Sequence, residues 1–212
     1  MQEESSLKKK VYDSLMQDML NGTVRPGQIL TEKSLIEKYQ VSKSPVRDAL
    51  ISLCNEGVFR SIPRCGYEVI RLTTDTIREI VDFRLGLELY CFRQIGSKLT
   101  EEELSDLELL AMKAHNIPEN ADMWYHWNGN IDFHLKLVSF YYNRYIYEQV
   151  EKSFKILTRA YVQEYWDTWR KVEVSEGDGQ HMRLIRLVRN KKFNEAEEVL
   201  QEDIRRIRTI LC

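Results

Sequence analysis

The residues V-S-K-S-P-V-R-D-A-L-I-S-L-C-N-E-G at positions 41–57 decide the fold predicted for this chain. Pro45 has no N–H to lose in the first turn of a helix, and Ser44 before it can cap the free amides, so a helix is expected to begin here. Gly57 can adopt the left-handed conformation that ends a helix. The apolar residues between these signals recur every three or four positions, which leaves the helix start around Arg47 polar and exposed. A capped, basic and exposed helix start fits the major groove of DNA.

The flanking sequence predicts short elements on both sides of this helix. Gly22 ends an apolar helical stripe, Pro26-Gly27 marks a turn, and Thr31 can cap a second short helix. Two strand-like runs enclose a turn that ends at Gly66, which predicts a hairpin. The expected bounds are 6–21 and 31–39 for the helices, and 58–61 and 67–71 for the strands.

Three segments of this region together resemble the winged helix-turn-helix of the GntR family of bacterial transcription regulators. They are G-T-V-R-P-G-Q-I-L-T-E-K-S-L (22–35), V-S-K-S-P-V-R-D-A-L (41–50) and E-G-V-F (56–59) followed by the turn at Gly66. The resemblance implies that residues 1–72 form a DNA-binding domain in which Arg47 contacts a base. The other contacts expected with bases, phosphates or through the wing are Lys33, Lys43, Ser44, Arg64 and Gly66. Arg64 can equally be a solvated residue of a hairpin. An ordinary amphipathic helix with a proline at its start would explain residues 41–57 alone, but not three segments in this order.

The remaining residues, 73–212, predict long helices without a strand or repeat pattern. A T-x-x-E capping box from Thr100 to Glu103 opens one of them. The expected bounds are 73–99, 100–117, 121–142, 145–169, 180–190 and 194–211. The predicted fold is therefore mainly α, with an N-terminal winged helix-turn-helix followed by an all-α helical bundle.

The helical half is similar to the C-terminal ligand-sensing domain, of the FCD type, in the FadR-like branch of the same family. The matching residues are Glu79, Ile80, Arg84, Glu88, the N-x-x-F-H run at 130–134, His181 and N-E-A at 194–196. This resemblance implies that residues 73–212 sense a small-molecule effector and dimerise, and Arg84 is expected to contact the effector.

The same resemblance implies a site for one divalent metal ion. Many members of the branch use an aspartate and a histidine four residues apart with two later histidines. The corresponding positions here are Asn130, His134, His181 and Asp203. The chain loses a carboxylate at Asn130 and regains one at Asp203, which lies in an apolar stripe where a carboxylate is costly unless it is paired or bound to metal. One zinc, manganese or nickel ion is expected; the alternative is a hydrogen-bonded network of the same side chains.

The composition describes a globular protein rather than a disordered, disulfide-rich or membrane-spanning one. Of 212 residues 43% are apolar and 30% charged, and the four cysteines form no C-x-x-C pair. No apolar run approaches the ~18 residues of a membrane span, and the N-terminus lacks a signal peptide's apolar segment, so a cytoplasmic location is expected. The net charge of −2 is unevenly distributed, with 11 Lys and Arg against 9 Asp and Glu in residues 1–72. DNA binding must therefore come from local placement of charge.

These patterns predict a sequence-specific DNA-binding regulator whose operator affinity depends on a small molecule, with an organic acid favoured as effector. One recognition helix contacts too few base pairs to specify a site, so a homodimer on near-palindromic double-stranded DNA is expected. The sequence contains no phosphate-binding loop, G-x-S-x-G motif or nucleophile cluster, and no catalytic residue is expected. The alternative is a metal-dependent hydrolytic enzyme with an appended DNA-binding anchor, because an open metal position can activate water.

Overall fold

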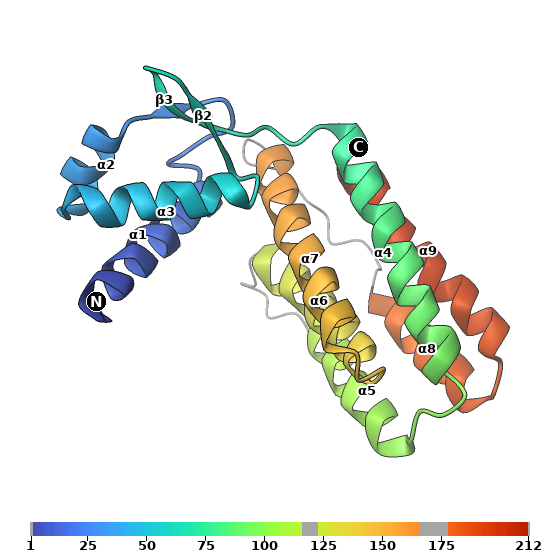
Figure 1. Ribbon diagram of the computed structural model, residues 1–212. Coiled ribbons are helices and arrows are strands. Elements are labelled where there is room, and N and C mark those ends of the chain that lie inside the picture. Colours follow the sequence, from blue (N-terminus) through green and yellow to red (C-terminus); the bar gives the residue numbers. More distant parts are fainter. Residues whose placement is uncertain (1, 116–122, 166–177, 212) are drawn as a thin grey trace. The chain divides into compact units, whose positions relative to one another are not determined.

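The computed structural model describes residues 2–115, 123–165 and 178–211 (Figure 1). This part of the chain forms two compact units. The first contains the described residues up to Leu72 together with residues 162–165, and the second contains the rest of the described residues. The described chain is mainly α, as predicted, and its strands lie in the first unit.

The N-terminal unit combines three helices with a small antiparallel sheet. Its elements are α1 (Gln2–Leu20), β1 (Ile29–Leu30), α2 (Glu32–Tyr39), α3 (Lys43–Asn55), β2 (Phe59–Ile62) and β3 (Gly66–Val69). The strand order is β1-β3-β2, and β2 and β3 form the predicted hairpin. The apolar faces of α1 and α3 and the strand residue Phe59 share one buried core. Strand β1 was not predicted, because the sequence pattern indicates no strand before residue 58.

The start of α3 differs from the prediction in its capping residue. The helix begins at Lys43 with Ser42 as the N-cap, so Ser44 lies inside the first turn and does not cap it. The Ser44 hydroxyl instead donates to Asp48 at 3.5 Å. Pro45 is tolerated in this turn because the first amides of a helix have no partner within it. At the other end Gly57 has φ +65°, the left-handed conformation that was predicted.

Gly66 holds the end of the wing close to the backbone of β1. Its φ is +131°, and a Cβ at this position would overlap the carbonyl oxygen of Leu30. Only glycine therefore fits here without moving backbone. Arg64, also in the turn, has φ +65°.

The second unit is a bundle of helices. They are α4 (Thr74–Ile95), α5 (Glu101–His115), α6 (Met123–Ser139), α7 (Arg144–Tyr165), α8 (Asp178–Arg189) and α9 (Phe193–Leu211). Helix α9 packs against α4 and α8, while α5 packs against α6 and α8. The predicted capping box is present, because Glu103 N donates to Thr100 Oγ1 and Thr100 N donates to Glu103 Oε2. The predicted helix ends at 116–117, 121–122 and 166–169 lie outside the described residues.

Charged side chains lie inside this bundle, on faces that are otherwise apolar. The buried ones are Arg84 and Glu88 on α4, His134 on α6, Arg159 on α7, His181 on α8 and Asp203 on α9. Burial of charge is costly unless the groups are paired or bind a ligand, so this interior is the first place to look for a binding site. None of the described helices combines the length and the apolarity that crossing a membrane requires.

Candidate functional site

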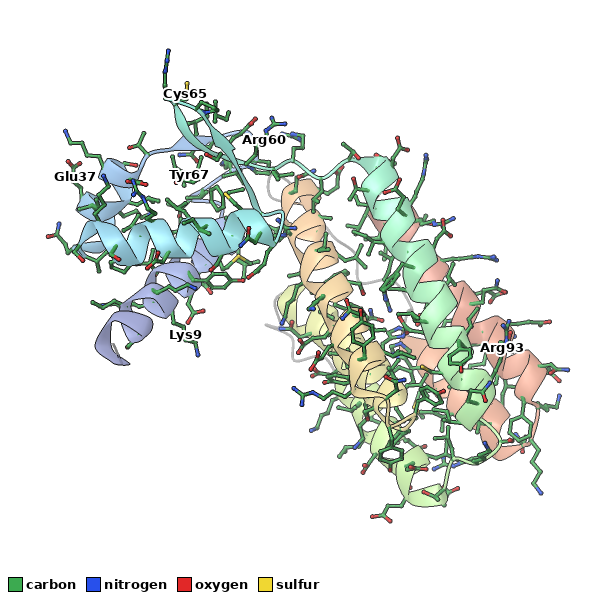
Figure 2. All side chains as sticks on the ribbon, viewed as in Figure 1. Lys9, Glu37, Arg60, Cys65, Tyr67 and Arg93 are labelled. Atoms are coloured by element: carbon green, nitrogen blue, oxygen red, sulfur yellow. The ribbon has the colours of Figure 1, made fainter. Side chains whose placement is uncertain are left out.

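The predicted DNA contacts lie at the exposed ends of α2, α3 and the β2–β3 hairpin. Lys43, Ser44 and Arg47 are exposed at the start of α3, and Lys33 is exposed on α2. Arg64 is exposed in the turn of the hairpin, next to Cys65, which Figure 2 labels at the tip of the wing. Their exposure leaves these side chains accessible to DNA, the arrangement that the winged helix-turn-helix interpretation requires.

Glu32 is a residue of this surface that the sequence analysis did not identify. Its carboxylate accepts hydrogen bonds from Arg47, at 2.9 Å from Nε and 3.4 Å from Nη2. Lys43 Nζ lies 3.6 Å away, and the Tyr67 hydroxyl donates at 3.5 Å. The hydrogen bond from Arg47 is the main reason that the pKa of the Glu32 carboxyl lies below its ordinary value. No local sequence signal marks this group, because Arg47 lies 15 residues away along the chain.

The second candidate site lies in the helical unit, where three predicted metal ligands come together. Donor atoms of His134, His181 and Asp203 all lie within 4.8 Å of one another, and all three residues are buried. Asp203 Oδ2 lies 2.9 Å from His134 Nε2 and 3.2 Å from His181 Nε2. The three side chains come from three helices, α6, α8 and α9, so only the folded bundle assembles them.

The geometry of this cluster fits a bound metal ion. Zinc–nitrogen and zinc–oxygen bonds of ~2.0–2.1 Å in a tetrahedron place neighbouring donor atoms about 3.3 Å apart. The two observed N–O separations lie close to that value. His134 Nε2 also approaches Asp203 without making a hydrogen bond, and it has no other hydrogen-bond partner among the described residues. When His134 is deprotonated at Nε2, a lone pair in that position can coordinate a cation.

Glu88 and Arg84 extend this cluster through α4. Glu88 Oε2 lies 2.7 Å from His134 Nδ1, and Glu88 Oε1 accepts from Arg84 Nε at 2.7 Å. A carboxylate on Nδ1 fixes the tautomer that presents Nε2 to a metal. The guanidinium of Arg84 lies over the Phe154 ring, 3.7 Å from its centroid, and its Nη1 and Nη2 atoms have no hydrogen-bond partner among the described residues. A buried guanidinium with two unpaired terminal nitrogens can bind a carboxylate with two parallel hydrogen bonds.

The electrostatics of the cluster follow from its burial and its opposite charges. Burial alone would raise the pKa of the Asp203 carboxyl, but the charge of His181 and the contact with His134 outweigh it and hold this pKa well below its ordinary range. Burial would lower the pKa of His134, but the carboxylates of Glu88 and Asp203 outweigh it and raise this pKa. The pKa of Glu88 is lowered, because Arg84 and His134 overcome the effect of its burial. Contacts between opposite charges thus stabilise the ionised forms of Asp203 and Glu88 and the protonated form of His134.

Asn130, the fourth predicted ligand, lies one turn before His134 on α6 and is half-buried. Its carbonyl oxygen stays a predicted ligand. The sequence analysis included Glu88 only among the residues that match the family, and gave it no role. The four-residue spacing of Arg84 and Glu88 on the buried side of one helix is the signal that could have paired them.

The chain is similar to known proteins in sequence and in fold. Residues 7–69 match the model described as bacterial regulatory proteins, gntR family, and residues 79–206 match the FCD domain. The HTH-type transcriptional regulator YdhC of Bacillus subtilis, described as uncharacterised, is 27% identical over 191 residues, which are 88% of this chain and 83% of that protein. The gluconate operon transcriptional repressor of the same organism is 36% identical over 115 residues, 53% of this chain and 47% of that protein. The structure of E. coli McbR/YncC superimposes with a TM-score of 0.76 at 23% identity, covering 97% of this chain and 96% of the other, and is similar in fold.

Proposed function

The chain belongs to the GntR family of bacterial transcription regulators and carries an FCD ligand-binding domain, and from this membership we propose a specific mode of action. A homodimer binds a near-palindromic operator through the two N-terminal units, residues 1–72. The helical domain, residues 73–212, binds an organic acid that changes operator affinity. A protein that binds chromosomal DNA acts in the cytoplasm, which is the location we propose.

In this proposal Arg47 makes the specific base contact. Its side chain is exposed at the start of α3, the part of a recognition helix that contacts base edges in the major groove. Arginine pairs with two acceptors on guanine, so this residue determines one position of each half-site. Lys33, Lys43 and Ser44 bind bases or phosphates beside it, and Arg64 and the Gly66 backbone contact the DNA from the wing.

The effector proposal depends on one observation, the buried guanidinium of Arg84 with two unpaired terminal nitrogens. The cost of leaving buried donors unsatisfied disappears when a carboxylate binds them. Glu88 and His134 connect this arginine to the metal cluster. We propose that an organic acid binds at Arg84. Its binding then changes the position of Glu88 and His134, and through them the geometry of the proposed metal site.

We propose that one zinc, manganese or nickel ion binds His134, His181 and Asp203, with Asn130 as a further oxygen donor. Two imidazoles and oxygen ligands suit these ions. When bound, the ion supplies positive charge that attracts an anionic effector and vacant positions that can accept its carboxylate. Glu88 orients His134 for this role, and Phe133 stacks on the His181 ring at a centroid distance of 3.8 Å and restricts its rotation.

The homodimer proposal is supported by an exposed apolar face on α4. Phe83 and Tyr90 are each 45% exposed and lie two turns apart on one side of the helix. Gly86 lies between them with open space where a Cβ would be. The same helix of a second copy, packed across a two-fold axis, would place an aromatic ring over each Gly86 and cover both faces.

The rival function is hydrolysis at the metal cluster. A zinc ion with a vacant position can activate water. The family and the relatives above are regulators, and regulation needs only binding, so a sensor is the function that we propose.

The decisive experiment presents purified protein with a pool of organic acids and their matched amides. Recovery of an unchanged acid on the protein, together with a change in operator affinity that an Arg84→Met variant lacks, supports the sensor. Conversion of any pool member into a product, at a rate that falls in a His134→Ala variant, would replace the sensor with the enzyme.

A further inference from the structure

Glu32, the first residue of α2, contacts two side chains of the proposed DNA-binding surface and a tyrosine of the wing. Its carboxylate contacts Arg47 and Lys43 from α3, and it accepts a hydrogen bond from Tyr67 on β3. Glu32 is also the first residue after the N-cap Thr31, a position where the helix dipole stabilises a negative charge. One carboxylate thus joins the second helix, the recognition helix and a strand of the wing.

The contact with Glu32 occupies only one edge of the Arg47 guanidinium. That edge consists of Nε–H and one N–H of Nη2. A guanidinium has five N–H donors, so Nη1 and the other hydrogen of Nη2 form a second edge. None of the hydrogen bonds described for this surface uses Nη1, and the side chain is 52% exposed. Guanine presents O6 and N7 to two parallel N–H donors, the pattern that this second edge offers.

We propose, on the basis of the DNA-binding function above, that Glu32 is a positioning residue for base recognition. It holds the guanidinium of Arg47 so that the Nη1–Nη2 edge is directed outward to guanine. A freely rotating arginine can bind phosphate oxygens as readily as a base edge, so it favours DNA without favouring a sequence. Fixing the guanidinium in one orientation turns a general DNA contact into a specific one.

This role makes a prediction that other roles of Glu32 do not. Its negative charge lies beside two cations and opposes the phosphates, so its removal should leave general DNA affinity unchanged or strengthen it. Its removal also frees Arg47, so the preference for guanine should fall. A residue needed only for folding would lower both quantities together. A residue that only neutralises Arg47 and Lys43 would strengthen all binding and leave the preference unchanged.

The experiment uses the full chain and two matched variants. The parent protein first selects sequences from a random double-stranded DNA library, which defines the operator and its critical guanine. Competition titrations then compare this operator with the same DNA carrying another base pair at that position. Glu32→Gln removes the charge and one acceptor oxygen. Glu37→Gln is the control, because Glu37 lies exposed on the same helix, where Figure 2 labels it, and pairs with Lys33 at 4.0 Å.

In Glu32→Gln the preference for guanine should fall by at least about tenfold, while affinity for random DNA stays equal or rises. Glu37→Gln should keep the parent's preference, and adding Arg47→Ala to Glu32→Gln should lower it by no more than about twofold further. Should Glu32→Gln fail to fold, Glu32→Asp tests the same contact with a shorter carboxylate and should also lose preference. A preference kept within about twofold in the folded variant would overturn the proposal. If the parent itself selects no sequence, the DNA-binding function fails, and this inference fails with it.

Discussion

The proposed metal site predicts a stabilisation that can be measured without knowing the effector. Zinc added to metal-free protein should bind the folded state through His134, His181 and Asp203, which lie on separate helices. At a free zinc concentration of 100 times Kd the stabilisation is about 2.7 kcal/mol. For a chain of this length each kcal/mol raises the unfolding midpoint by about 2–4 °C, so a rise of about 5–11 °C is expected.

The His134→Ala, His181→Ala double variant should lose this zinc-dependent rise. For each protein the quantity to compare is the change in unfolding midpoint caused by zinc. The midpoints themselves cannot be compared directly, because removing two buried partners of Asp203 also destabilises the metal-free protein. Glu197→Gln is the control, since Glu197 lies on the same helix as Asp203 but pairs with the exposed Arg93. Scanning calorimetry gives the midpoints, and elemental analysis of protein prepared without chelator or affinity tag gives the stoichiometry. Equal zinc effects in parent and double variant, with no stoichiometric metal, would leave only the hydrogen-bonded network.

The same prediction has a defined pH dependence. The neighbouring carboxylates raise the pKa of His134 despite its burial, so the proton on His134 competes with the metal near neutral pH. Zinc affinity should therefore increase as pH rises from 6 toward the raised pKa of His134, by up to about tenfold per pH unit, and level off above it. Isothermal titration calorimetry in buffers of different ionisation enthalpy would show the released proton, because the measured binding enthalpy then depends on the buffer. Binding that weakens over the same pH rise would refute this assignment.

Three further predictions follow from other parts of the structure. Glu88→Gln leaves the buried guanidinium of Arg84 without a carboxylate and should lower the free energy of unfolding by about 3–5 kcal/mol in urea titration; a loss below ~1 kcal/mol would contradict the pairing. Exposed Cys65 should react rapidly with a thiol reagent, whereas Cys91, whose pKa burial raises to about 11, should react only on unfolding; mass spectrometry that finds equal rates would refute this difference. Light scattering should give a mass of about 50 kDa at micromolar concentration, twice the chain mass of 25.2 kDa, and Phe83→Glu should lower this mass toward that of a single chain. A parent protein that is monomeric both free and on DNA would count against the dimer.

Helix positions in the N-terminal unit could be predicted because local signals determine them. The predicted N-cap Thr31 and the left-handed Gly57 both occur as expected. The prediction was wrong for the cap of α3, where Ser42 and Ser44 are both suitable residues and only packing selects between them. It missed β1, a two-residue strand that exists only because β3 lies beside it. A two-residue strand is too short to show an alternating pattern, so its pairing with a distant strand cannot be predicted from the sequence.

The candidate sites divide in the same way. His134, His181 and Asp203 were predicted as one group, because the two histidines match the family pattern in type and Asp203 occupies the position of a third ligand, with a carboxylate in place of an imidazole. The hydrogen bond that Arg47 donates to Glu32 and the unpaired terminal nitrogens of Arg84 were not predicted, because each depends on how the fold brings distant side chains together. The sequence gives the residue types at a site, but the direction in which a single N–H bond points depends on how the side chains pack in the folded structure.

The close approach of Gly66 to the β1 backbone determines where the wing can be redesigned. No side chain fits at Gly66, so a mutant library aimed at new operator preferences should keep this glycine constant. The neighbouring Cys65 and Arg64 are exposed and can be randomised. At Arg64, whose φ is +65°, asparagine and glycine should be enriched among well-folded clones, since both residues tolerate the left-handed conformation. The same substitution that relieves the backbone also removes a cation from the wing, so if Arg64 contacts DNA as proposed, the most stable clones should not be the ones that bind DNA most tightly.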